Sequence, residues 1–146
     1  VAGGLALGTA LMKTGLASTL VNAIPFGIMP ALAVLVVSGI VGYVISNFLS
    51  HTSAANLLLP ILTAIAVGAM GTPMGDQLEL LGGVQALLMG LAISTSVAMV
   101  LPISTPPNAI ASSTGLIETK DMAKVGIILG VVGLVLGYGV LIFVGF

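Results

Sequence analysis

Charged side chains are almost absent from two long stretches of this chain. Between Lys13 and Asp76 the only side chain that can carry a charge near neutral pH is His51, and between Glu79 and Glu118 there is none. Both stretches are longer than the roughly 20 apolar residues with which a helix crosses a bilayer. Charged residues make up 5% of the chain, against roughly 25% in ordinary soluble domains. We therefore expect an all-α integral membrane protein.

The composition also narrows the class of function. Arginine, tryptophan and cysteine are absent, so nothing suggests a nucleic-acid surface, a disulfide framework or a cysteine-bound metal or redox site. A single histidine without a nearby carboxylate argues against a transition-metal site and against an intramembrane enzyme, which needs a nucleophile, a base and an orienting group within reach.

Apolar runs and their interruptions divide the chain into six segments. We expect the end of a membrane helix and an interfacial helix in residues 1–24, two apolar arms around a polar centre in 25–70, and an aqueous loop in 71–80. A broken membrane helix with a proline-rich loop at 102–108 follows in 81–117, then a second aqueous loop in 118–124 and a final membrane helix in 125–146. The chain begins inside this pattern, so we interpret it as a fragment.

The first polar cluster lies at the centre of 25–70. It comprises Ser46, the run from Ser50 to Ser53, and Asn56. Hydroxyls and amides are unfavourable in apolar surroundings unless they find partners. Two interpretations stay open from the residues alone: the tip of a re-entrant hairpin that lines a wet cavity, or an exposed loop between two complete spans.

The second polar cluster is Ser104, Thr105, Pro106, Pro107 and Asn108. Prolines remove backbone donors and oppose helical geometry in the residue before them. A discontinuous helix of this kind can bind cations through free carbonyls and anions through N-terminal amides. The alternative is a kink that only shapes packing. No carboxylate is near either cluster in the sequence, so sodium would be held by neutral oxygens.

At these residues the sequence resembles the divalent anion:sodium symporter family. Ser50-His51-Thr52, followed by residues 57–61 (LLLPI), resembles the tip of the family's second re-entrant hairpin, and residues 102–110 resemble its signature loop. Residues 3–17 resemble the approach to its connecting helix. The resemblance implies a C-terminal inverted repeat with a hairpin tip at 50–53, a discontinuous transmembrane helix and a final transmembrane helix. It also implies that an N-terminal half is missing.

The resemblance further implies roles for individual residues. Substrate would be bound by Ser50, His51, Thr52, Thr105 and Pro106, and sodium by Ser46, Ser50, His51, Ser104 and Asn108. His51 stands where the family usually has asparagine. A neutral imidazole would replace the amide's hydrogen bonds, whereas a protonated one would make transport sensitive to pH; both hypotheses stay open.

The function implied by the resemblance is sodium-coupled symport of small divalent anions by alternating access in the cell membrane. We expect C4-dicarboxylates such as succinate, malate or fumarate, with sulfate or another divalent oxyanion as the alternative, and anion exchange or a channel as further ones. Sodium would be the coupling ion, with no other cofactor, and the transporter would be a homodimer in the lipid bilayer. Lys120 and Lys124 would place segment 118–124 on the cytoplasmic side.

Overall fold

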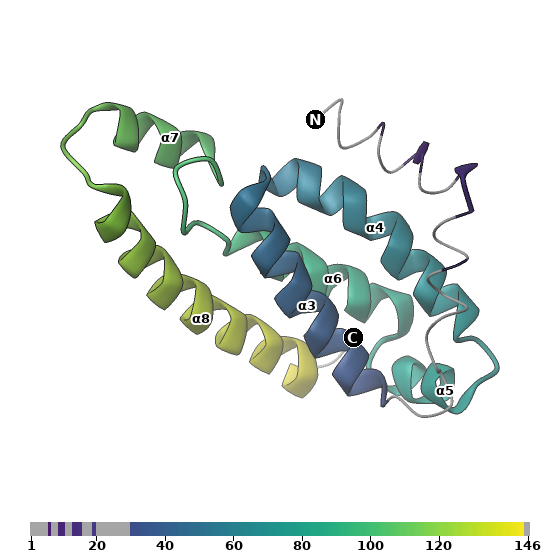
Figure 1. Cartoon of the computed structure of the whole chain (residues 1–146). Helices are drawn as coiled ribbons and strands as arrows, with labels where there is room; N and C mark the ends of the chain where they lie inside the picture. Colours follow the sequence, from purple (N-terminus) through teal and green to yellow (C-terminus); the bar gives the residue numbers. More distant parts are fainter. Residues whose placement is uncertain (1–5, 7–8, 11–12, 16–18, 20–29, 145–146) are drawn as a thin grey trace.

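The computed structural model of the chain describes residues 6, 9–10, 13–15, 19 and 30–144 (Figure 1). Most of segment 1–24, where we expected a helix end and an interfacial helix, lies outside these residues. The described part is helical and contains no strand. Three of its helices are long and apolar enough to span a membrane, and a bent pair would make a fourth. The prediction of an all-α membrane protein is confirmed.

The two apolar arms expected in 25–70 form a pair of antiparallel helices. Helix α3 covers Ala31–Phe48 and α4 covers His51–Gly68. Only Leu49 and Ser50 lie between them, so most of the polar run at the expected tip belongs to the first turn of α4. Each arm has 18 residues, which is about 27 Å of helix. That length suits either a short membrane span or one arm of a re-entrant hairpin.

A short helix forms within segment 71–80, where we expected a loop. Helix α5 covers Pro73–Leu80, and the side chain of Thr72 caps its N-terminal end. Met74 and Leu78 are buried in the core, which explains why these residues form a helix rather than an exposed loop. Helix α5 lies at the end of the hairpin opposite its tip (Figure 1).

The membrane helix expected in 81–117 is broken, and the break begins before the proline-rich loop. Helix α6 covers Gly83–Ser96, residues 97–105 are not helical, and α7 covers Pro106–Ser113. We expected the first half to continue to Leu101. It ends earlier because peptide groups after its last turn hydrogen-bond to the hairpin tip instead of to their own helix.

The final helix begins earlier than the expected segment 125–146. Helix α8 covers Thr119–Val144, so most of segment 118–124, where we expected an aqueous loop, forms its first turns. The charged side chains of those turns are exposed: Lys120, Asp121 and Lys124. The most apolar 18 residues of helix α8 have a mean hydropathy of 2.8, the highest such value among the candidate spans in the described part.

Helix α6 lies at the centre of the described structure and packs against α3, α4, α5 and α8. Its buried residues recur in pairs every four positions, at Ala86 and Leu87, Gly90 and Leu91, and Ser94 and Thr95. The small residues let neighbouring helices approach closely. The leucines fill the space toward Leu35 of α3 and Leu58 of α4, so the core forms around this one helix.

Helix α8 packs on this core through a row of glycines, Gly126, Gly130, Gly133 and Gly137. A β-carbon at Gly126 would lie 2.6 Å from the Met99 carbonyl oxygen, so a larger residue does not fit there without movement. The Tyr138 hydroxyl donates to the Leu35 carbonyl at 3.3 Å and lies 3.2 Å from the Ser94 hydroxyl. Helix α8 is thereby tied to the break and to the first arm of the hairpin.

Candidate functional site

The hairpin tip lies between the C-terminal end of α3 and the N-terminal end of α4. Ser50 caps α4, because its Oγ accepts the Ser53 N–H at 3.3 Å. The same Oγ donates to the Ser53 hydroxyl at 2.8 Å. Serine is among the residues that most favour this capping position, which explains locally why a new helix starts here.

The break between α6 and α7 ends in the same way. Thr105 caps α7 by accepting the Asn108 N–H at 3.2 Å. Pro106 and Pro107 are the first residues of α7, where a helix does not use its own N–H groups. The prolines therefore begin a new helix instead of kinking a continuous one, which was the alternative explanation of this motif.

The two polar clusters lie against each other at a contact that we call the joint. The tip is linked to the break and the end of α6 by four hydrogen bonds: Ser46 Oγ to the Thr95 carbonyl at 3.2 Å, the Val100 N–H to Asn47 Oδ1 at 2.9 Å, Ser104 Oγ to the Asn47 carbonyl at 3.0 Å, and His51 Nε2 to the Ala98 carbonyl at 2.6 Å. The partners are 47 to 57 residues apart in the chain, so only the tertiary fold brings them together.

Four helix ends meet at this joint. The C-terminal ends of α3 and α6 bring partial negative charge and carbonyl oxygens, whereas the N-terminal ends of α4 and α7 bring partial positive charge. At α7 the first two residues are prolines, so this end offers its dipole but no N–H group of those residues. Neither residues 31–68 nor residues 83–113 contain Asp, Glu, Lys or Arg. The arrangement can hold a cation through carbonyls next to an anion at the positive helix ends.

The residues expected to bind sodium all lie at or beside the joint. Ser46 and Ser104 are buried and donate to carbonyls across it. Asn108 donates from Nδ2 to two carbonyls of the break, at 2.9 and 3.3 Å, and Ser50 is exposed at the tip. The Nε2 of His51 faces a carbonyl, which can only accept, so this nitrogen carries hydrogen and is not free to bind a cation.

The residues expected to bind substrate lie on the first turns of α4 and α7. Thr52 and Pro106 are exposed like Ser50, and His51 and Thr105 are half-buried. All five therefore lie at the positive ends of two helices, where an anion is favoured. The fold brings the two groups of residues near one another, and their substrate role stays a prediction.

Asn47 contributes a side chain to the joint, although the sequence argument assigned it no role. Its side chain bonds to the Tyr43 carbonyl and the Val100 N–H, both at 2.9 Å, and its own carbonyl accepts from Ser104. The sequence feature that could have pointed to Asn47 is an amide side chain next to Ser46, at the end of an apolar run. Such an amide needs partners, but the sequence does not show where they lie.

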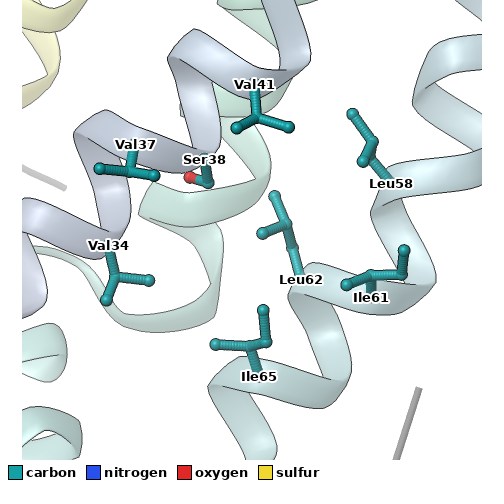
Figure 2. A pocket seen from close by; sticks show the side chains of 8 residues that line it. All are labelled: Val34, Val37, Ser38, Val41, Leu58, Ile61, Leu62 and Ile65. Atoms are coloured by element: carbon teal, nitrogen blue, oxygen red, sulfur yellow. The ribbon is translucent and has the colours of Figure 1, made fainter. Parts of the chain in front are cut away.

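A groove of about 220 Å³ lies away from the joint, between the two arms of the hairpin (Figure 2). Its lining is apolar except for one hydroxyl, and comprises Val34, Val37, Ser38, Val41, Leu58, Ile61, Leu62 and Ile65. The hydroxyl of Ser38 already donates to the Leu35 carbonyl at 2.9 Å. A divalent anion has no polar partners there, so this groove is not the anion site.

Comparison with known proteins gives the family of the chain. Residues 1–144 match the family described as "Sodium:sulfate symporter transmembrane region". The chain is 34% identical to the sodium-dependent dicarboxylate transporter SdcS of Staphylococcus saprophyticus, over 85% of the chain and 22% of that protein. It is 33% identical to Na(+)/dicarboxylate cotransporter 3 of Rattus norvegicus, over 73% and 16%, and 30% identical to solute carrier family 13 member 1 of Homo sapiens, over 91% and 21%.

The matched family and the named relatives are transporters, which places the chain among multi-pass membrane transport proteins and not among enzymes. The chain belongs to the sodium:sulfate symporter family, over nearly its whole length. This confirms the resemblance to divalent anion:sodium symporters and the location in the cell membrane. Relatives in this family are named as sodium-dependent transporters of dicarboxylates, so sodium is the coupling ion of the family. The chain spans about a fifth of the length of these relatives.

Proposed function

We propose that the complete protein is a sodium-coupled symporter of small divalent anions, with C4-dicarboxylates such as succinate, malate and fumarate as substrates. The joint is the observation that carries this proposal, because residues 31–68 and 83–113, which form it, contain no Asp, Glu, Lys or Arg that could offset the charge of a bound anion or cation. A doubly charged anion is unfavourable in a site without cationic side chains unless other charges offset it. Sodium ions bound next to the anion supply those charges, which is the physical reason for coupling.

In this proposal the two kinds of ligand occupy different sides of the joint. Sodium lies where the C-terminal ends of α3 and α6 present carbonyls, near Ser46, Ser50, Ser104 and Asn108. The anion lies at the N-terminal ends of α4 and α7, contacted by Ser50, Thr52, Thr105 and Pro106, with His51 between the two ligands. The capping geometry of Ser50 and Thr105 supports this placement.

The proposal includes a re-entrant hairpin whose tip stays inside the membrane. In support, the tip bonds to residues around the end of α6, whereas α7 and the start of α8 lie beyond it (Figure 1). Helix α8, with 26 residues, is about 39 Å long, compared with about 27 Å for each arm. An N-terminal repeat would complete the site, and the homodimer would work by alternating access.

Sulfate is the second candidate substrate. The description of the matched family names sodium:sulfate symport. Sulfate, like a dicarboxylate, is a divalent anion whose oxygens accept hydrogen bonds from hydroxyl and amide donors. The described residues of the joint do not distinguish one sulfate group from two carboxylates held a fixed distance apart. A competition experiment between the two anions therefore decides which one is the substrate.

The test is uptake of radiolabelled succinate by the full-length protein in proteoliposomes, with potassium in place of sodium as the control. We expect accumulation above the external concentration that requires a sodium gradient and is unaffected by excess unlabelled sulfate. Equal uptake in potassium would refute the coupling, and strong inhibition by sulfate would assign the transporter to sulfate. Uptake that stops at equal concentrations would indicate a channel, and uptake that requires internal succinate would indicate exchange.

A further inference from the structure

His51 reaches across the joint from the first position of α4. Its imidazole is half-buried, and Nε2 lies 2.6 Å from the Ala98 carbonyl oxygen. A carbonyl oxygen has no hydrogen to give, so Nε2 must be the donor whatever the state of the other ring nitrogen. In the structure, the hydrogen-bond donor that His51 could offer to an anion is therefore already paired.

The carbonyl that accepts this bond has the features of a cation ligand. Ala98 is fully buried and lies in the non-helical stretch directly after α6. Among residues 30–144, no backbone N–H bonds to this oxygen, so the imidazole is its partner. An unwound carbonyl at the C-terminal end of a half-helix is the kind of group that binds sodium in transporters with discontinuous helices.

Building on the proposed symport, we propose that His51 links sodium binding to anion binding by changing partners. Sodium and the Nε2–H compete for the Ala98 carbonyl, because a cation and a hydrogen of partial positive charge repel each other a few ångströms apart. Sodium that takes this oxygen releases the imidazole. The freed N–H then turns, by side-chain rotation alone, to the anion at the N-terminal ends of α4 and α7.

The exchange of partners changes the two binding affinities by an amount that can be stated, and the effect of each ligand on the other is reciprocal. Without sodium the donor is bound to the Ala98 carbonyl and contributes nothing to the anion; with sodium it is available. A single hydrogen bond changes an equilibrium constant by about three- to tenfold. Linkage requires that the anion favour sodium binding by the same factor as sodium favours anion binding.

The test compares three variants of the purified full-length protein in detergent. His51→Ala removes the donor, His51→Gln keeps an amide N–H at a similar reach, and Thr63→Val is the control, because Thr63 is exposed on α4 and bonds within its own helix. Two quantities are measured: the sodium concentration that gives half of the maximal thermal stabilisation without substrate, and the affinity for labelled succinate at low and at high sodium.

For His51→Ala we expect the half-saturating sodium concentration to fall about three- to tenfold, because sodium no longer displaces the imidazole. The ratio of succinate affinities at high and low sodium should shrink by a similar factor. His51→Gln and Thr63→Val should stay near the unmodified protein. If His51→Ala does not fold, His51→Asn takes its place with the same expectation, since its amide is too short to reach the carbonyl.

An unchanged or higher half-saturating sodium concentration in the alanine or asparagine variant would overturn the coupling role of His51. The same holds if His51→Gln behaves like His51→Ala, because the donor would then not be the group that matters. Both results presuppose an unmodified protein whose succinate affinity depends on sodium. An unmodified protein that binds succinate equally with and without sodium would instead overturn the proposed symport.

Discussion

At the scale of single residues, the joint is held by side chains that bond to backbone groups of another segment. Asn47 is the clearest case, because its amide bonds to its own helix at Tyr43 and to the break at Val100. Ser46 and Ser104 could be singled out from the sequence because hydroxyls are conspicuous in apolar runs. The partners of Asn47 could not be foreseen, because they are peptide groups that every residue carries.

The first prediction at this scale concerns Asn47. Replacing Asn47 by alanine leaves the Val100 N–H without its partner, and we expect a loss of about 1–3 kcal/mol in the free energy of unfolding. Thermal unfolding of the full-length protein in detergent measures it. Asn56→Ala is the control, because no side-chain hydrogen bond involves Asn56 among residues 30–144. Equal stability of the two variants would show that the Asn47 bonds do not hold the joint together.

The second residue-scale prediction separates substrate binding from helix stability. Thr52 is exposed on the first turn of α4, whereas Thr63 lies three turns further along the same helix. We expect Thr52→Val to weaken succinate affinity about three- to tenfold, the size of one lost hydrogen bond, and Thr63→Val to leave it unchanged. Succinate titration at saturating sodium measures both, and equal affinities would remove Thr52 from the proposed site.

At the scale of elements, α8 is the helix whose position depends most on small residues. Four of its glycines, Gly126, Gly130, Gly133 and Gly137, face the core, and most of its large apolar side chains are exposed. The hydropathy of the chain predicted that such a helix exists, because a long apolar run has few other structures available to it in a membrane. Which segments α8 packs against depends on close contacts at its glycines, and the hydropathy of the sequence does not show these contacts.

The prediction at this scale compares two glycines of α8. Gly126→Ala places a β-carbon 2.6 Å from the Met99 carbonyl oxygen, whereas a β-carbon at Gly139 meets nothing within 4 Å. We expect Gly126→Ala to lower the free energy of unfolding by about 1–3 kcal/mol relative to Gly139→Ala. The comparison cancels the higher helix propensity of alanine. A Gly126→Ala protein as stable as its control would contradict the close contact between α8 and the break.

Two elements also show where linear patterns mislead. Segment 71–80 has the proline, glycine and charged residues of a loop, but Met74 and Leu78 recur at a spacing that buries them on one helical face. The end of α6 was expected at a proline because prolines stop helices. It lies earlier because the tip competes for the peptide groups of the break.

At the scale of the whole molecule, the order of the helices makes a topology that can be tested. The start of α6 and the end of α8 lie at one end of the structure, and α7 and the start of α8 lie at the other (Figure 1). From Lys120 and Lys124 near the start of α8, the positive-inside rule predicts that this end faces the cytoplasm.

The prediction at this scale uses single cysteines, because the chain itself contains none. Glu79→Cys and Leu116→Cys are both exposed positions at opposite ends, introduced into a full-length protein without other cysteines. We expect a membrane-impermeant maleimide to label Glu79→Cys in intact cells and to label Leu116→Cys only after permeabilisation. Labelling of both from outside would exclude this topology.

The sequence by itself determined the environment, the helical class and the family of this protein. The reason is that these depend on composition and on the spacing of charges along the chain, which are linear properties. The tertiary structure alone decided where α6 ends, that residues 73–80 are helical, and that His51 bonds to Ala98. Those features depend on hydrogen bonds and close contacts between residues far apart in the chain, and such partners are chosen only when the helices pack.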